Sequence, residues 1–397
     1  MDSPARHVGD VERRARLVRR HALAPDHRVG DAEAATRAVV VLHSTEPHNV
    51  HLAVAARTEG VGVADVDAAL YDDRSLVKQL AMRRTLFVFP RDLLPAAWGS
   101  ASARVAEAER KRIGGNVVAA GLADDGDDWL AARRAEVLDL LGSGPLGAQA
   151  LREQLPALDV KVAVSLGSKW GGPVPIAPRV LGWLGARGDI VRGVNGGHWR
   201  LSRPRWTLMS EWLGEEPRPA PEAEGYRELV RRWLARFGPG TETDLVWWLG
   251  STRTAVRRAL ADVGALPVSL DSGATGWLLP DDLGADEPEP PSAALLPTLD
   301  PTTMGWKERD FYLDPDLAPY LVDTNGNAGT TAWWGGRVVG CWVQDDDGRV
   351  RVVVRDDPGS RARRALDAEA ERVTAWLGGG VVGNIYKSRM MKGALLP

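Results

Sequence analysis

The sequence predicts an α+β protein made of three tandem winged-helix units and a C-terminal β-rich region. An order of helix, short helix, helix and hairpin occurs twice, and in both copies Gly-Pro precedes the second helix. A weaker copy precedes these two, and the C-terminal part alternates as strands do. A chain of 397 residues is also longer than a single compact core accommodates. We place the units at 1–125, 126–215 and 223–285, and the β-rich region at 290–397.

The first unit is the weakest of the three copies. Its apolar spacing predicts three helices, with Leu70 and Leu76 on the inner face of the last one. A run of β-branched and aromatic residues then predicts a strand. The expected elements are helices at Val11–His21, Asp31–Leu42 and Val66–Leu80, and a strand at Thr85–Phe89.

The second unit has the same order, interrupted by an irregular insertion at Val160–Pro178. The insertion contains a glycine-rich stretch, Gly167–Gly171, which lacks the Gly-Lys-Ser/Thr of a phosphate-binding loop, so we expect no nucleotide cofactor. The turn Asn195-Gly196-Gly197 predicts a wing hairpin. The expected elements are helices at Leu130–Leu141, Ala148–Leu155 and Arg179–Arg187, and strands at Ile190–Val194 and His198–Leu201.

The third unit has the clearest pattern. Apolar residues recur at helical spacing through Tyr226–Phe237, and Gly238-Pro239-Gly240 ends that helix. A Thr/Asp-rich start and a final glycine delimit a short helix at Thr241–Gly250. The remaining elements are a helix at Thr254–Val263 and strands at Pro267–Leu270 and Gly276–Leu279.

The C-terminal region alternates between apolar and polar residues, which predicts strands. It ends with the spacing of an amphipathic helix. The expected elements are strands at Ala293–Leu296, Asp310–Leu313, Arg337–Val343 and Arg349–Arg355, and a helix at Ala362–Leu377.

Composition excludes several classes of protein. The single cysteine, Cys341, rules out an internal disulfide framework and a Cys-rich zinc site. No stretch approaches 18 apolar residues, and the N-terminus has no signal-peptide core. We therefore expect a cytoplasmic protein without a membrane partner. The sixteen tryptophans are expected to be mostly core anchors.

Charge is unevenly placed in a chain whose net charge is −3. Six arginines accompany one acid, Asp189, between Arg179 and Arg205, and acids gather at Asp281–Glu289. The pattern favours a directed positive surface that binds nucleic acid, with solvated helix faces as the alternative. A further cluster lies in the first helix, at Arg13, Arg14, Arg16, Arg19 and Arg20.

The segment Leu42–Pro47 (LHSTEP) gathers an imidazole, two hydroxyls and a carboxylate at the junction of two elements. Such a junction favours side chains that point into a cleft. A metal at His43, His48 or His51 is an alternative, but their spacing matches no familiar zinc pattern, so we expect no metal. A purely structural alternative is that His43 bonds a buried backbone group and that Ser44 or Thr45 caps the next helix.

Four segments together resemble one family across nearly the whole chain, at 42–47, 82–90, 295–313 and 336–342. They are similar to the AlkZ/YcaQ-like superfamily of tandem winged-helix DNA glycosylases. The resemblance implies a C-shaped scaffold of three winged helices around duplex DNA, and excision of bulky N7-alkylated purines. The family's catalytic motif, Gln-x-Gln or Gln-x-Asp, falls on His43 and Thr45, so this chain departs from the pattern at both positions.

The residues present suit the reaction that the resemblance implies. An N7-alkylated guanine already carries positive charge and leaves without a general acid, so the protein must place a water and stabilise an oxocarbenium-like transition state. A neutral His43 can accept a proton from that water. Thr45 can hold the water or a phosphate, and Glu46 can place a charge near the developing cation.

DNA contacts are expected from four places in the chain. The resemblance puts Trp306, Lys307 and Arg309 on a hairpin that approaches DNA, where an exposed Trp306 would wedge at a lesion. A core tryptophan with solvated charges is the alternative there. The remaining candidates are Arg83 and Arg84 before the first-unit strand, His48 and Asn49 beside the motif, and Lys387 and Arg389 in the basic tail.

The leading hypothesis is a monofunctional DNA glycosylase for bulky alkylated purines, acting in adduct or crosslink repair or in self-resistance to a toxin. Its partner would be double-stranded DNA carrying alkylated bases, read by base flipping or in place in the groove. A non-catalytic winged-helix regulator or lesion binder is the alternative, and a protein that binds the genotoxin itself is a third. Because no heptad run supplies a dimerisation element, we expect a monomer.

Overall fold

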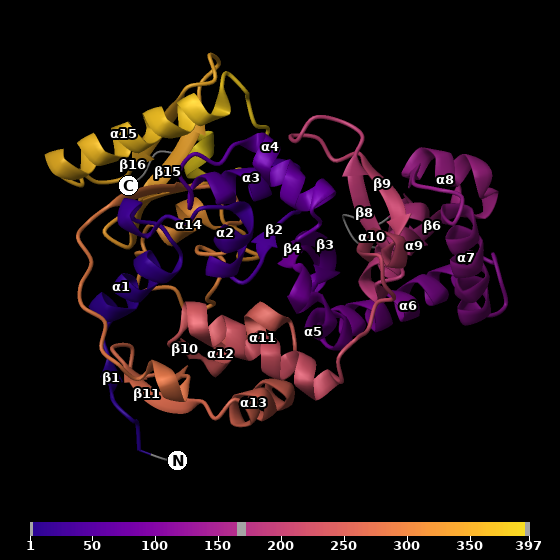
Figure 1. Ribbon diagram of the computed structural model, residues 1–397, viewed down its shortest axis with the longest axis horizontal. Helices are drawn as coiled ribbons and strands as arrows, with labels where there is room; N and C mark the ends of the chain where they lie inside the picture. Colours follow the sequence, from indigo (N-terminus) through magenta and orange to yellow (C-terminus); the bar gives the residue numbers. More distant parts are fainter. Residues whose placement is uncertain (1–2, 165–171, 394–397) are drawn as a thin grey trace.

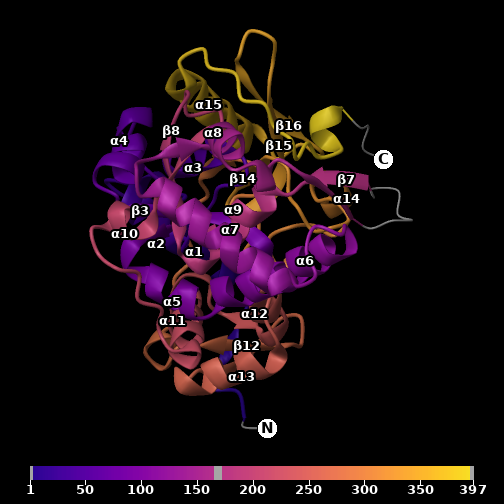
Figure 2. The same cartoon turned by 90° about the vertical axis from the view of Figure 1, so that its right-hand side faces the viewer.

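The computed structural model describes residues 3–164 and 172–393, and Figure 1 shows a mixed fold of helices and small sheets. Figures 1 and 2 agree on the arrangement. The segment 222–278 lies at one end of the molecule, the C-terminal sheet with helix α15 lies at the other, and the segment 126–208 extends to one side.

Three segments of the chain share one order of elements: helix, short strand, two helices and a hairpin. In each sheet the last strand lies between the short strand and the first hairpin strand. We call these segments repeats 1, 2 and 3. Repeat 1 comprises α2 (Ala32–Ala38), β2 (Leu42–His43), α3 (Pro47–Ala55), α4 (Val63–Asp67), β3 (Leu76–Ala81) and β4 (Thr85–Pro90).

Repeats 2 and 3 follow after α5 (Leu94–Gly99) and α6 (Ala101–Ala119). Repeat 2 comprises α7 (Gly126–Leu141), β5 (Leu146–Gly147), α8 (Ala148–Gln154), α9 (Ala177–Arg187), β8 (Ile190–Asn195) and β9 (Pro204–Leu208), followed by α10 (Met209–Leu213). Repeat 3 comprises α11 (Glu222–Phe237), β10 (Gly240–Thr241), α12 (Glu242–Leu249), α13 (Arg253–Asp262), β11 (Leu266–Leu270) and β12 (Thr275–Leu278).

Repeat 3 follows its sequence signals closely, and the predicted elements are confirmed. Thr241 caps α12 by accepting the backbone N–H of Asp244, whose carboxylate returns a bond to the backbone N–H of Thr241. Gly250 ends the helix in the left-handed conformation, with φ +60°. These signals act within a few residues of one another, which is why the sequence alone predicts them.

Repeat 1 corrects two predicted helices. The helix predicted at Asp31–Leu42 ends at Ala38, because the β-branched run Val39–Val41 leaves the helical conformation, with Val40 at φ +66°. The helix predicted at Val66–Leu80 ends by residue 72, and Leu76–Ala81 forms strand β3 instead. Strand β3 pairs along its whole length with β4, so sheet pairing overrides the helical spacing of its leucines.

Repeat 2 corrects the predicted wing. Its second strand is β9 (Pro204–Leu208), whereas residues 198–201 lie in a loop that the Asn195 amide holds by donating to three carbonyls. The insertion contains a hairpin of β6 (Lys161–Val164) and β7 (Gly172–Pro175). The glycine-rich stretch Gly167–Gly171 lies outside the described residues.

The C-terminal region forms one antiparallel sheet in the order β13 (Ala293–Leu296), β14 (Thr331–Trp334), β15 (Arg337–Gln344) and β16 (Val350–Val354). Helix α15 (Ser360–Leu377) packs on this sheet. Strand β14 was not predicted. The predicted strand Asp310–Leu313 is wrong: those residues form turns that bury Phe311–Leu313, ahead of the short helix α14 (Ala318–Leu321).

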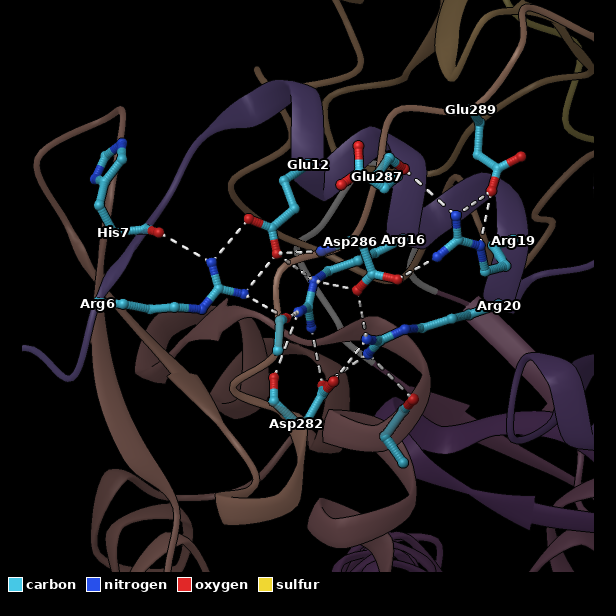
Figure 3. Close-up of polar contacts among 12 residues, drawn as sticks. Arg6, His7, Glu12, Arg16, Arg19, Arg20, Asp282, Asp286, Glu287 and Glu289 are labelled. Carbon is cyan, nitrogen blue, oxygen red and sulfur yellow. Dashed lines mark hydrogen bonds and ion pairs between the residues drawn. The ribbon is translucent and has the colours of Figure 1, made fainter.

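The predicted positive surface on the first helix is also wrong. Helix α1 (Asp10–Arg20) packs beside repeat 3, and strand β1 (His7–Val8) joins the sheet of repeat 3 through a parallel pairing with β11. Figure 3 shows Arg16, Arg19 and Arg20 of α1 bound to the acidic segment 281–289. Arg16 and Arg20 both donate to the Asp282 carboxylate, at 3.0 and 2.7 Å. These three arginines and the acidic segment therefore neutralise each other.

The tryptophans are mostly core anchors, as predicted, since ten of the fifteen within the described residues are buried. One of them is a correction: Trp306, expected to be exposed, is only 2 % exposed. Its ring packs against Phe237 and Phe311 at centroid distances of 5.0 and 5.1 Å. Residues 297–317, all of them described, contain no strand, so Trp306 is not on a hairpin and cannot wedge into DNA. In the described part of the chain, no helix is long and apolar enough to cross a membrane.

Candidate functional site: a polar motif beside a basic groove

The LHSTEP motif joins a strand to a helix. Leu42 and His43 form β2, which pairs with Val88 and Phe87 of β4, and Pro47 begins α3. Proline suits this first helical position because its missing N–H would have no partner there. His43 and Ser44 are buried, whereas the Thr45 side chain is exposed. The junction predicted from sequence therefore presents Thr45 to solvent, with His43 behind it.

His43 is a neutral imidazole held in an apolar setting. The ring lies edge-on to Phe87 at 5.2 Å and is 7 % exposed. Burial, and secondarily the positive charge of Arg83, lower the pKa of His43 to about 3. Its Nδ1 accepts the Thr45 backbone N–H at 3.5 Å, which places the remaining proton on Nε2. This bond is at the outer limit of hydrogen bonding, so it fixes the tautomer weakly.

Glu46 does not face a substrate, which corrects its predicted role. The carboxylate is fully buried. One oxygen accepts the backbone N–H groups of Ile385 and Tyr386, and the other accepts the hydroxyl of Thr298. Glu46 therefore ties the C-terminal tail to the motif.

His48 and Asn49 are also buried, so the prediction that they contact DNA is wrong. His48 Nε2 lies 3.2 Å from the Asn384 side-chain oxygen, and burial lowers the pKa of His48. The Asn49 amide lies 3.1 Å from the hydroxyl of Thr298. Both residues are on the inner face of α3 and join it to the C-terminal region.

The three histidines near the motif have different hydrogen-bond partners. His51 Nε2 lies 3.0 Å from an oxygen of Asp67, whereas His48 Nε2 contacts Asn384. Within residues 3–164 and 172–393, no group of three or more His, Cys, Asp or Glu side chains is placed to hold a metal ion.

Arg83 and Arg309 place unneutralised positive charge beside the motif. Their guanidinium groups lie 4.0 and 5.5 Å from the ring of Trp247. Burial, together with the charge of Arg309, lowers the pKa of Arg83 to about 10. Arg83 Nε and Arg309 Nη1 are buried without a hydrogen-bond partner, and neither guanidinium pairs with a carboxylate in the described ranges. Buried cations of this kind favour binding of an anion.

Arg309 also lines a groove with a cavity volume of about 810 Å³. Two segments distant in sequence, 307–327 and 385–392, form its walls. The buried Asp244 carboxylate accepts the backbone N–H groups of Lys307 and Glu308, both at 2.8 Å, and so fixes the first wall to α12. Five cations line the groove against one carboxylate, that of Asp323: Lys307, Arg309, Lys387, Arg389 and Lys392.

The structure brings most of the predicted DNA-binding cations together at this groove. Lys307, Arg309, Lys387 and Arg389 line it, and Arg83 lies near Arg309. Arg84 is separate: its Nε lies 2.7 Å from the buried Glu109 carboxylate, which Arg112 also approaches at 3.2 Å. Sequence reasoning missed Lys392, Ile385 and Trp247. The doublet Trp247-Trp248 was the available signal for Trp247, because only one of two adjacent helical residues can face a core.

A groove lined by cations, beside a motif in the first of three similar repeats, is typical of proteins that bind nucleic acid. The family model described as DNA glycosylase AlkZ-like matches residues 36–376. The chain therefore belongs to the AlkZ-like DNA glycosylase family. Its structure is similar to that of the DNA glycosylase AlkZ of Streptomyces sahachiroi, with a TM-score of 0.72 over 93% of this chain and 97% of that chain. At 20% identity the likeness shows the fold. A comparison with curated proteins found no match.

Proposed function

We propose that this protein is a monofunctional DNA glycosylase that hydrolyses the N-glycosidic bond of bulky N7-alkylated purines in duplex DNA. It would act in the repair of adducts or interstrand crosslinks, including self-resistance to an alkylating toxin. The observation that carries the proposal is the unneutralised Arg83 guanidinium, which lies close enough to His43 to lower the pKa of its imidazole and has the Arg309 guanidinium as its neighbour. Membership in a DNA glycosylase family supports it.

We further propose that repeats 1, 2 and 3 are winged-helix units that enclose the duplex as a C-shaped, monomeric scaffold. The placement of the last strand between the short strand and the first hairpin strand, shared by the three sheets, supports this assignment, because a short first strand beside a closing hairpin is the pattern of that module. Each winged helix would contact the backbone from a different side, so one chain would supply the DNA surface that regulators obtain by dimerisation.

The reaction needs little proton transfer from the protein. The N7-alkylated purine leaves with the electron pair of its bond to C1′, and a water adds to the resulting oxocarbenium-like carbon. A pKa of about 3 makes His43 a weak base, so we assign its imidazole to orienting that water. The water's proton then passes to solvent. The exposed Thr45 hydroxyl is suited to hold the same water from the solvent side.

Arg83 and Arg309 would bind phosphates next to the lesion. A phosphate there satisfies the unpartnered guanidinium atoms and places negative charge near C1′, where positive charge develops. Lys307, Lys387 and Arg389 would continue the contact along the backbone.

The test uses a duplex with one bulky N7-guanine adduct, incubated with protein and then treated with alkali to break the strand at abasic sites. We expect breaks with the wild type and at least about a 100-fold slower reaction with His43→Ala, the loss typical of a group that positions a reactant. The rate with Thr45→Ala should lie between those of the wild type and His43→Ala. Val11→Ala, which changes an exposed apolar residue on α1, is the control.

The alternative is a winged-helix protein that binds lesions without excising them. The replacement of the family's glutamine by His43, together with the burial of its ring, favours this alternative. Tight binding to the adduct duplex without abasic sites would support it and reject the glycosylase.

A further inference from the structure

Ile385 has the most exposed large apolar side chain among the described residues, at 79 % exposure. Single exposed apolar residues are common on protein surfaces, so exposure alone says little. The position of Ile385 is informative, because it lies on the wall of the basic groove, next to Tyr386 and Lys387. At this exposure, little of the aliphatic side chain is packed against the protein itself.

The backbone of Ile385 is fixed by a buried carboxylate. Glu46 accepts the N–H groups of Ile385 and Tyr386, and the neighbouring Asn384 side chain contacts His48 Nε2. Hydrogen bonds to an ionised acceptor are stronger than those between neutral groups. Since Glu46 belongs to the motif, these bonds join the motif directly to Ile385, which lines the groove.

The rest of the groove wall matches a polyanion. Lys387, Arg389 and Lys392 follow Ile385 in the chain, and Lys307 and Arg309 lie on the opposite wall. Such a surface binds the phosphates of both strands of a duplex, which would bring the base pairs between them against Ile385. Proteins that distort duplexes insert apolar side chains of this type, including isoleucine, between base steps.

We infer that Ile385 is a wedge that inserts between base pairs beside the lesion, and that Glu46 is the positioning residue that holds it there. The inference rests on the proposed function in one respect, that duplex DNA occupies the groove. Ile385 thus takes the wedge role that was expected of Trp306. A buried Glu46 can position Ile385 without touching DNA, because its carboxylate binds the backbone N–H of Ile385.

The test uses a duplex with 2-aminopurine beside a tetrahydrofuran abasic-site analogue, and follows the fluorescence that rises when 2-aminopurine unstacks. We expect a rise with the wild type and a rise at least about threefold smaller with Ile385→Ala, because the smaller side chain cannot separate the stacked bases. The dissociation constant of Ile385→Ala should change by less than about threefold, since the phosphate contacts remain.

Val381→Ala is the matched control, because Val381 lies on the same tail, is 50 % exposed and does not line the groove. It should retain the full fluorescence rise. Glu46→Ala should lose the rise as Ile385→Ala does, and the double variant should lose no more than either single variant. Glu46→Gln, which keeps an acceptor oxygen, should recover part of it. Additive losses would reject the positioning role of Glu46.

An unchanged rise in Ile385→Ala, or no rise in the wild type despite binding, would overturn the wedge. The adduct-cleavage assay separates this result from the proposed function. A rise that depends on Ile385 without abasic sites would reject the glycosylase and keep the wedge. Abasic sites without such a rise would support the glycosylase and reject the wedge. Failure to bind the duplex would reject both.

Discussion

The low pKa of His43 predicts that the imidazole reduces stability in acid. In the folded protein the pKa is about 3, whereas in the unfolded chain His43 has the ordinary value near 6.5. Below pH 6.5 the unfolded chain binds a proton that the folded protein does not bind. A group whose pKa is depressed by folding favours the unfolded state as pH falls through the unfolded value, so the stability present at pH 8 is lost in acid.

The magnitude follows from the distance between the experimental pH and the unfolded pKa. At pH 5 the gap is about 1.5 units, and each unit is worth about 1.4 kcal/mol, so His43 lowers the free energy of unfolding by about 2 kcal/mol relative to pH 8. His43→Gln removes the titrating group and keeps a neutral polar side chain. Between pH 8 and pH 5, the free energy of unfolding of the variant should therefore fall by about 2 kcal/mol less than that of the wild type.

The measurement is urea unfolding of the wild type and His43→Gln at pH 8, 6 and 5. Other histidines, such as the fully buried His21, also titrate, but they are common to both proteins and cancel in the difference. His198→Gln, which removes an exposed imidazole, is the control. If the two pH dependences agree within about 0.5 kcal/mol, His43 ionises alike in both states and the assignment of a buried neutral imidazole is refuted.

Three further predictions concern the pH dependence of cleavage, DNA binding and the buried ion pair of Arg57 with Asp300. Between pH 5 and 8 the adduct-cleavage rate should not follow a titration of His43, whose pKa is about 3; a tenfold fall per unit below pH 6.5 would show that it acts as a general base. Arg83→Ala and Arg309→Ala should each reduce the slope of log affinity against log salt concentration by about one, measured by fluorescence anisotropy, and an unchanged slope would exclude a phosphate contact. Asp300→Ala should reduce the free energy of urea unfolding by about 3–5 kcal/mol, because it leaves the buried Arg57 guanidinium without its bidentate partner at 2.7 and 2.9 Å; a loss under about 1 kcal/mol would contradict this.

The fold was predictable where the signals are local. The cap at Thr241, the glycine at 250 and the helical spacing of α11 define repeat 3 within a few residues. Residues 66–80 were predicted as one helix because buried leucines at positions 70 and 76 fit a helix as well as a strand. Both leucines are buried in the structure. Only the pairing of β3 with β4 decides between helix and strand, and no short stretch of sequence specifies that pairing.

The candidate site was predictable in its placement at a junction of two elements and less so in its contacts. His43 and Thr45 are candidates from sequence because the motif is continuous, and the groove cations because they belong to basic runs. The burial of Glu46 could not be found, because its partner Ile385 lies 339 residues further along the chain. Trp306 was misplaced for a similar reason, since its packing partner Phe237 belongs to repeat 3 and not to the C-terminal region.

The charges of the site suggest why the chemistry would depend on bound DNA. In the free protein His43 is neutral, while Arg83 and Arg309 are positive and unpaired, a setting that opposes a cationic transition state. Phosphates bound at both guanidinium groups would neutralise them and make the surroundings of C1′ negative. Burial is the larger cause of the low pKa of His43, so neutralising Arg83 would leave the imidazole uncharged. We therefore expect the duplex itself to supply the negative charge that the buried Glu46 cannot provide.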